Sequence, residues 1–243
     1  MELIADLHMH NSSCVHAYSS IDEIALAAEE KNLKCIALTE HGPATADAPK
    51  ISHFFNMHVV PPYLHGVRVL HGAETGLTAP FGKPDLPDGI LKRLDFVIIS
   101  MHNDGMPQRY NKSDYTNAYI RALENPYIDA LGHLLRYGHE IYIEPVIKTA
   151  AKHNKIIEIN ELSFARDKSY ADVFLPVLEM CKKYGVHIML SSDAHHASLI
   201  GKFETGIQLV KQTDYPQELI INSSQERLLN YLNGRPLKNK ITL

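Results

Sequence analysis

The sequence has few cysteines and no long apolar run, and these absences exclude several classes of protein. Cys14, Cys35 and Cys181 form no CxxC pair and are too few for a disulfide framework, which predicts a reducing compartment, by default the cytoplasm. No run of about 18 apolar residues occurs, and the N-terminus lacks the basic and apolar regions of a signal peptide. We therefore expect neither a membrane span nor a secreted protein.

An excess of basic residues is also absent. The chain has 24 Lys and Arg against 28 Asp and Glu, a formal net charge of -4, so no overall positive field would hold nucleic acid or an anionic membrane. Its 243 residues, 45% of them hydrophobic, are enough for one large core. We expect residues 1–243 to form a single domain.

Histidine, by contrast, is abundant. Fifteen histidines occur, several times the usual share, while tryptophan is missing altogether. Near the N-terminus, the stretch DLHMH places His8 and His10 two residues apart at the end of an apolar run, and His16 follows six residues later. Each imidazole is a metal ligand or an acid-base group at neutral pH, so the position of the other histidines decides the interpretation.

Short apolar runs alternate with amphipathic stretches along the chain. Seven runs rich in β-branched residues predict strands at 3–7, 34–39, 67–74, 95–100, 127–132, 155–160 and 187–192. Seven helices are predicted. One begins at the capping box at 20–23, two lie near 87–94 and 113–124, one begins at Pro145, and one ends at a Gly185 cap. The last two lie at 203–212 and 224–233, the second of them with Ser223 and Glu226 at its start.

This alternation predicts an α/β fold in which parallel strands are joined by right-handed crossovers. An open doubly wound sheet and a closed barrel both fit. No GxGxxG or GxxxxGK[ST] motif is present, so the nucleotide-binding reasons for an open sheet are missing. In a barrel, the long connections at about 42–66 and 103–111 would build a site.

Residues that bind metals stand at the C-terminal ends of six of the seven predicted strands, which share one rim in a barrel. These residues are His8, His10, His41, Glu74, His102, His133, Asp193 and His195, with His16 in the loop after the first strand. The two-residue spacing within DLHMH and within SSDAH points both side chains of each pair to the same face. Because one zinc ion takes about four ligands, nine side chains predict a cluster of two or three ions.

The remaining candidates are weaker. Any single histidine is more often a surface or core residue than a ligand, and only the joint placement at one rim argues otherwise. We assign no role to His53, His58, His65, His71, His139, His153, His187 and His196. Cys14 fits an ordinary small residue better than a soft ligand, and Asp6 fits a structural hydrogen bond as well as a role in orienting a ligand imidazole.

The motifs DLHMH, HAYS, TEHG, GAE, SMH, GH and SSDAH, in this order, resemble the PHP (polymerase and histidinol phosphatase) superfamily. The chain length and the HAYS segment are most similar to the stand-alone YcdX-type phosphatases. The resemblance implies a distorted seven-stranded (βα) TIM-like barrel with a trinuclear metal centre at the C-terminal rim. It implies zinc, although manganese and iron also tolerate this ligand mix.

Carried over residue by residue, the resemblance implies three ligand groups. His8, His10, Glu74 and Asp193 would hold one ion, Glu74 would bridge to a second held by His102 and His133, and the third would take His16, His41 and His195. Two positions depart from the family. Glu40 stands where Asp is usual, and Leu134 stands where Pro usually follows the histidine.

The resemblance implies a metal-dependent phosphatase that hydrolyses small phosphomonoesters. A metal-activated hydroxide, positioned through Glu74 and Asp193, would attack phosphorus. Arg166, after the strand at 155–160, is the best cation to grip the phosphate, although a solvated loop arginine is equally consistent. No residue is identified as the acid for the leaving group.

Two other functions remain open. A PHP-type 3′–5′ exonuclease would need a basic, aromatic-lined groove, to which Arg136, Tyr137 and Tyr142 are the nearest approach. A non-catalytic metal-binding regulatory module is disfavoured by the intact ligand set. We expect a small phosphorylated substrate, no membrane and no nucleic-acid partner, and the sequence leaves homo-oligomerisation and the substrate itself open.

Overall fold

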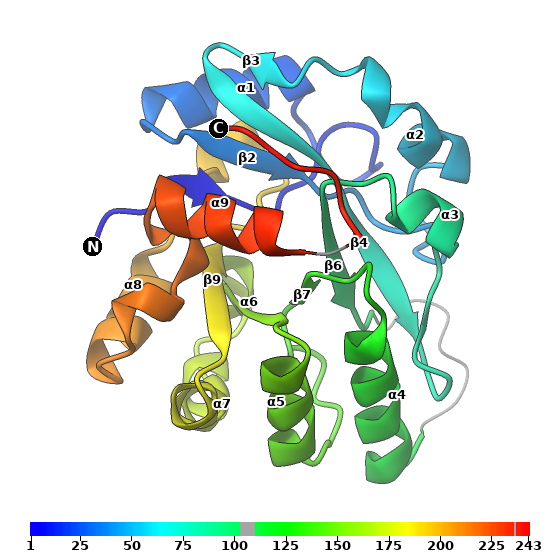
Figure 1. Ribbon diagram of the computed structural model, residues 1–243, viewed down its shortest axis with the longest axis vertical. Coiled ribbons are helices and arrows are strands. Elements are labelled where there is room, and N and C mark those ends of the chain that lie inside the picture. Colours follow the sequence, from blue (N-terminus) through cyan, green and yellow to red (C-terminus); the bar gives the residue numbers. More distant parts are fainter. Residues whose placement is uncertain (103–109, 236) are drawn as a thin grey trace.

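The computed structural model describes residues 1–102, 110–235 and 237–243 and contains a seven-stranded parallel sheet (Figure 1). The strands are hydrogen-bonded in the order β1-β2-β4-β6-β7-β8-β9. Their bounds are β1 Ala5–Asp6, β2 Cys35–Leu38, β4 Val67–Thr78, β6 Phe96–Ser100, β7 Ala130–Leu131, β8 Ile156–Asn160 and β9 His187–Ser191. All seven predicted strands and their parallel direction are confirmed.

The sheet curls until its two edge strands nearly meet. Just past β1 and β9, Met9 and Ala194 form an isolated parallel bridge, and the amide of Asp193 donates to the carbonyl of His8 at 2.9 Å. Deeper in the seam, the buried Asn222 amide donates to the carbonyl oxygens of Ala5 and Leu190, each at 2.8 Å. The result is a nearly closed, distorted barrel, which confirms the predicted fold class.

Side chains alternate between two cores along each strand. On β6, Phe96 and Ile98 point to the cluster inside the barrel, whereas Val97 and Ile99 face the surrounding helices. Helix α9 (Gln225–Gly234) contributes Leu228, Tyr231 and Leu232 to the inner cluster. In Figure 1 it runs across the front of the sheet.

The end of the barrel that α9 covers is the N-terminal one. The Tyr231 hydroxyl donates to the carbonyl of Asp129, and the Arg235 guanidinium donates to the carbonyl of Asp95. Asp129 and Asp95 each stand immediately before a strand, β7 and β6. The rim at the C-terminal ends of the strands is therefore the end left for a site.

The helices follow the predicted pattern. They are α1 Ile21–Glu30, α3 Asp88–Leu91, α4 Lys112–Glu124, α5 Ile143–Lys152, α7 Tyr170–Tyr184, α8 Glu204–Gln212 and α9. Ser20 and Glu23 form the predicted capping box, and Gly185 ends α7 in the left-handed region with φ 64°. In the parts of the chain that the structure describes, no helix has both the length and the apolar character needed to cross a membrane.

Several local predictions were wrong. Ser224, not Ser223, caps α9, because its side chain accepts from the Arg227 amide. Helix α5 begins at Ile143, so Pro145 is its third residue. The predicted loop at 42–66 contains α2 (Ile51–Asn56), a 3-10 turn (Met57–Val59) and β3 (Tyr63–Leu64), which pairs antiparallel with β4, as does β5 (Lys83–Pro84).

Two further differences concern predicted loops near the rim. Arg166 lies on a short helix, α6 (Glu161–Arg166), because the Asn160 side chain caps a new helix directly after β8. The second predicted site loop, 103–111, lies largely outside the described residues, which omit 103–109.

Candidate metal centre

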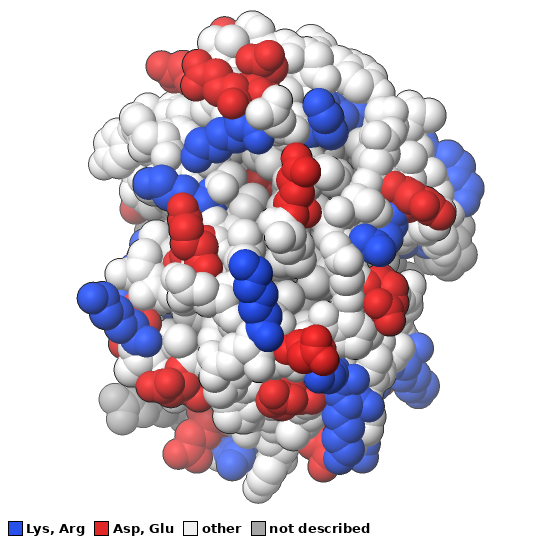
Figure 2. Space-filling view, turned by 90° about the vertical axis from the view of Figure 1, so that its left-hand side faces the viewer, with Lys and Arg blue, Asp and Glu red and all other residues white. Residues whose placement is uncertain are grey.

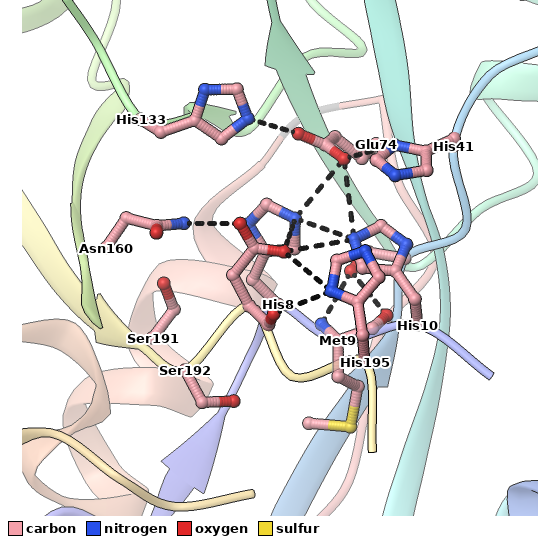
Figure 3. Close-up of polar contacts among 12 residues, drawn as sticks. His8, Met9, His10, His41, Glu74, His133, Asn160, Ser191, Ser192 and His195 are labelled. Carbon is pink, nitrogen blue, oxygen red and sulfur yellow. Dashed lines mark hydrogen bonds and ion pairs between the residues drawn. The ribbon is translucent and has the colours of Figure 1, made fainter. Parts of the chain in front are cut away.

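All nine predicted ligands meet at the C-terminal rim of the barrel. Figure 3 shows six of them, His8, His10, His41, Glu74, His133 and His195. Six are buried and three are partly exposed. The buried six are His8, His10, His41, Glu74, His133 and Asp193, and the others are His16, His102 and His195. Seven of them follow the ends of β1, β2, β6, β7 and β9 by a few residues, and His16 lies in the loop after β1. Glu74 lies inside β4, which continues to Thr78 beyond the predicted strand end at residue 74. Parallel strands of a closed barrel bring these ends together, as the sequence predicted.

Four donor atoms of this cluster lie close together around His8 and His10. His8 Nε2 lies 3.3 Å from His10 Nε2, 3.4 Å from Glu74 Oε2 and 3.5 Å from Asp193 Oδ1. His10 Nε2 lies 3.5 Å from the same Glu74 oxygen and 3.2 Å from the same Asp193 oxygen. Donors placed tetrahedrally about 2.1 Å from one ion lie about 3.4 Å apart. The donor atoms of His8, His10 and Asp193 therefore have the spacing of three ligands of one zinc-sized cation, and Glu74 Oε2 approaches both imidazoles.

Glu74 connects this group to its neighbours. Its Oε1 lies 2.7 Å from His133 Nε2 and 3.2 Å from His102 Nε2, while its Oε2 lies 2.7 Å from His41 Nδ1. One carboxylate thus contacts imidazoles on three strands besides the first pair. This is the geometry of a carboxylate that can bridge two ions.

The outer part of the cluster consists of stacked imidazoles. His16 Nε2 lies 3.2 Å from His41 Nε2, and the ring of His195 lies 4.9 Å from that of His16 and 4.4 Å from that of His10. The donor atoms of His10, His41 and His195 also fall within 4.8 Å of one another. A cation bound here would take its ligands from the loop after β1 and from the ends of β2 and β9.

Several buried polar atoms at the centre have no partner in the protein. Asp193 Oδ1, Glu74 Oε2 and both ring nitrogens of His102 take part in no hydrogen bond with any residue that the structure describes. A buried polar group without a partner costs about 1–3 kcal/mol, so several at one point need compensation from a further group. Divalent cations satisfy such atoms, and the donor set fits them.

The electrostatics keep most of the imidazoles neutral, the form that binds metals. Burial and the neighbouring His41 hold the pKa of His10 well below its usual range, and burial together with Arg136 lowers the pKa of His133 to about 4. His8 and His102 are the exceptions. Burial alone would lower the pKa of His8, but Glu158, Asp193 and Glu74 outweigh the burial and raise it well above the usual range. Burial would also lower the pKa of His102, but Glu74 outweighs it and raises the pKa.

A second layer of polar residues, which the sequence prediction missed, supports the ligands. Glu158 on β8 accepts from His8 Nδ1 at 2.5 Å. Arg136 donates to Asp193 Oδ2 at 2.7 Å, to Ser163 Oγ at 2.7 Å and to Asn160 Oδ1. The signal for Glu158 was a charged residue inside the apolar run IIEIN. The sequence singled out Arg136 only for the nuclease alternative and gave no signal of its contact with Asp193.

Asp6, for which the sequence left an orienting and a structural role equally open, serves a structural role. Its carboxylate accepts from the backbone amides of Ser192 at 3.1 Å and Gly201 at 2.9 Å. It makes no side-chain contact with an imidazole among the described residues. Asp6 therefore ties β1 to the segment after β9 and leaves the orientation of His8 to Glu158.

The backbone around two ligands is unusual. Asp193 has φ 53° and His133 has φ 22°, both in a region that non-glycine residues rarely adopt. Before His133, Gly132 has no room for a side chain, since a Cβ there would lie 2.1 Å from Ser100 Oγ. These conformations persist because packing and hydrogen bonds hold them, and they aim His133 at Glu74 and Asp193 at His8 and His10.

A cavity of about 330 Å³ opens onto the ligand cluster. Its walls carry His16, His41, Thr45, Asp47, His102, Arg136, Tyr137, Arg166, Asp193 and His195. The predicted phosphate-binding residue Arg166 is exposed at its mouth, while Arg136, only 9% exposed, lies against Asp193. One exposed and one largely buried arginine thus face the same polar cavity.

The family departure Glu40 lies beside the cluster. Its Oε1 accepts from the backbone amide of Asn11 at 2.9 Å, and burial raises the pKa of Glu40 to about 7. Cys14, Glu40 and His10 also have donor atoms within 4.8 Å of one another. The longer side chain thus makes contacts on the loop after β1. Leu134 is fully buried, and its carbonyl accepts from the Tyr170 hydroxyl.

Comparison with known proteins gives consistent matches. The PHP domain family model matches residues 6–162. A probable phosphatase of Caldicellulosiruptor bescii is 40% identical over 233 residues, covering 96% of each chain, and one of Acetivibrio thermocellus is 36% identical over 235 residues, covering 97% of each. The crystal structure of Lactococcus lactis histidinol phosphate phosphatase, complexed with zinc, L-histidinol and phosphate, has a TM-score of 0.64 at 19% identity. It covers 87% of this chain and 94% of the other, a likeness of fold.

Proposed function

Because the chain belongs to the PHP domain family, we propose that it is a metal-dependent phosphatase that hydrolyses small-molecule phosphomonoesters. The observation that carries the proposal is the grouping of His8 Nε2, His10 Nε2 and Asp193 Oδ1 within 3.2 to 3.5 Å of one another, with Glu74 Oε2 3.4 Å from His8 Nε2 and 3.5 Å from His10 Nε2. The names of its relatives as probable phosphatases support the same reaction class.

The proposed centre holds three divalent ions, with zinc first and manganese or iron as alternatives. His8, His10, Glu74 and Asp193 would hold one ion, and Glu74 with His102 and His133 a second. His16, His41 and His195 would hold the third. The contacts of Glu74 with His102 and His133 support its role as the bridge. The zinc in the structure of the Lactococcus lactis phosphatase supports the choice of metal.

Ions at this centre would supply an acidified water as nucleophile and neutralise the phosphoryl oxygens. The side chains of the protein would position the reacting groups. Glu74 and Asp193 would fix the position of the attacking water through the ligand cluster. Arg136 would hold Asp193 in place, and Arg166 at the mouth would offer its guanidinium to the phosphate.

The cavity supports a small, polar substrate. At about 330 Å³ it has room for a phosphate and a modest alcohol. Among the residues that the structure describes, its walls offer no aliphatic side chain and one aromatic ring beyond the imidazoles, that of Tyr137. The exonuclease alternative needs a basic groove with stacking rings. On the face shown in Figure 2, Lys and Arg are interspersed with Asp and Glu instead. Arg136, the nearest cation, is engaged by Asp193.

We also propose that residues 1–243 act as one domain. Ala5 near the N-terminus and Leu232 on α9 belong to the same inner core, so both ends of the chain contribute to one folding unit. All three cysteines are free, which supports a reducing compartment, by default the cytoplasm.

The test compares substrates on one preparation. Purified protein is assayed with a panel of small phosphomonoesters and with single-stranded oligonucleotides, beside His10→Ala and a matched control, His58→Ala, at an exposed histidine outside the cluster. We expect monoester turnover that His10→Ala abolishes and His58→Ala leaves unchanged. Oligonucleotide shortening without monoester turnover would support the nuclease instead, and bound metal without any turnover would support the non-catalytic module.

A further inference from the structure

Glu158 is a fully buried carboxylate on β8 with a partner for each of its oxygens. Oε1 accepts from His8 Nδ1 and from Ser191 Oγ, both at 2.5 Å. Oε2 accepts from the backbone amide of His133 at 2.6 Å. The side chain thus reaches from β8 to the ends of β1 and β7. It lies behind the ligand cluster and does not line the cavity.

The contact with His8 decides which ring nitrogen carries the proton. An ionised carboxylate can only accept, so Nδ1 of His8 must donate to it. In the neutral imidazole that binds a metal, the lone pair is then left on Nε2, the atom 3.3 to 3.5 Å from His10 Nε2, Glu74 Oε2 and Asp193 Oδ1. Glu158 therefore fixes both the tautomer and the orientation of this imidazole toward the centre.

The contact with His133 acts on the backbone. His133 has φ 22°, and its amide is held by Glu158 Oε2 at 2.6 Å. In this conformation His133 Nε2 lies 2.7 Å from Glu74 Oε1, the oxygen that also faces His102. Without its acceptor, the amide would be a buried donor lacking a partner, which is unfavourable. The second oxygen therefore favours the backbone conformation that aims His133 at Glu74.

We propose that Glu158 is a positioning residue that fixes one ligand in each of two adjacent metal positions, His8 through one oxygen and His133 through the other. The proposal rests on the metal centre of the proposed function. Outer partners that orient ligand histidines typically contribute about 10- to 100-fold in metal affinity. Because one carboxylate serves both positions here, its loss weakens two ions together and leaves the third, around His16 and His195, largely unaffected.

Asp6 offers a matched control. It is a carboxylate as deeply buried as Glu158, but its acceptors face the backbone amides of Ser192 and Gly201. A generic effect of removing a buried carboxylate near the site appears in both variants. An effect through His8 and His133 appears only at Glu158.

The substitution Glu158→Gln preserves the shape of the side chain and inverts part of its hydrogen bonding. If the amide oxygen accepts from the His133 amide, the NH₂ group faces His8 Nδ1 and demands a lone pair there, which moves the His8 proton to Nε2. If the amide is flipped, its NH₂ group opposes the His133 N–H. Either orientation disturbs a ligand.

The experiment titrates metal-free wild type, Glu158→Gln and Asp6→Asn with Co²⁺, following visible absorption, and with Zn²⁺ against a competing chelator. We expect about 10- to 100-fold weaker binding of two equivalents and altered cobalt bands in Glu158→Gln alone. A merely structural role would lower the unfolding temperature and leave the bands and affinities unchanged. Wild-type binding in folded Glu158→Gln, or equal losses in Asp6→Asn, would overturn the proposal.

A second variant covers the case in which Glu158→Gln does not fold. Glu158→Asp keeps the charge but is one methylene too short to span His8 and His133, so at least one equivalent should weaken; unchanged binding in it would overturn the proposal too. Wild type that binds metal without cleaving monoesters refutes the proposed function and not the role of Glu158. Monoester turnover by the wild type, together with unaltered metal binding in the Glu158 variants, refutes the role of Glu158 and leaves the proposed function standing.

Discussion

Removing the Arg136 guanidinium should cost far more stability in metal-free protein than in metal-loaded protein. Its pair with Asp193 is 2.7 Å long, with the two side chains only 9% and 2% exposed. Breaking a buried pair by removing one partner costs about 3–5 kcal/mol, because the other charge is left uncompensated. We expect a loss of this size for Arg136→Met in the presence of a chelator.

In zinc-loaded protein the same substitution should cost less. Asp193 is then compensated by the neighbouring cation, and what remains is mainly the loss of the donors to Asn160 Oδ1 and Ser163 Oγ. Hydrogen bonds of this kind are worth about 1–2 kcal/mol in total. Zinc should therefore stabilise Arg136→Met by about 2–3 kcal/mol more than it stabilises the wild type.

Urea unfolding with chelator and with saturating zinc measures both quantities. Arg93→Met serves as the control, since Arg93 is exposed and its contact is a cation-π stack on Phe55, worth about 0.5–1 kcal/mol. The reasoning would be refuted by an Arg136→Met loss below about 1 kcal/mol in chelator, or by equal losses with and without zinc.

Three further predictions follow from other parts of the fold. Gly132→Ala should destabilise the protein by about 2 kcal/mol or more, because the added Cβ would lie 2.1 Å from Ser100 Oγ; near-wild-type urea unfolding would contradict this. Asn222→Ala leaves the carbonyls of Ala5 and Leu190 without their donor in the seam and should cost about 2 kcal/mol, seen as a lower Tm. Burial lowers the pKa of Lys238 to about 8, below its unfolded value, so the unfolded chain binds more protons above pH 8 and stability rises with pH. Between pH 7 and 9 the wild type should gain about 1 kcal/mol relative to Lys238→Met; parallel pH profiles would contradict the shift.

The rim of ligands could be predicted from the sequence because it follows from local rules. Period-two spacing puts His8 and His10 on one face, and parallel strands bring their C-terminal ends to one place. The pairs DLHMH and SSDAH carry that information in a few residues each. The alternation of strands and helices likewise reflects local hydrophobic patterns, which is why all seven strands were found.

The supporting layer depends on contacts that no local pattern encodes. Arg136 reaches Asp193, 57 positions away, and Asn222 closes a seam with Ala5, 217 positions away. The conformation of His133 results from the Glu158 contact and from the space that Gly132 leaves. Glu158 itself was detectable as a charge in an apolar strand, but its partners were not. Only the contacts in the structure distinguish Glu158 from Asp6, because in the sequence both are single carboxylates in an apolar strand.

The most direct test of the account is a metal titration coupled to turnover. Metal-free protein receives increasing zinc or manganese while bound metal and phosphomonoester hydrolysis are measured on the same samples. The account predicts saturation at about three equivalents, with turnover appearing as the ions bind and disappearing again with chelator. Saturation at one equivalent or fewer, or turnover that persists in metal-free protein, would contradict it.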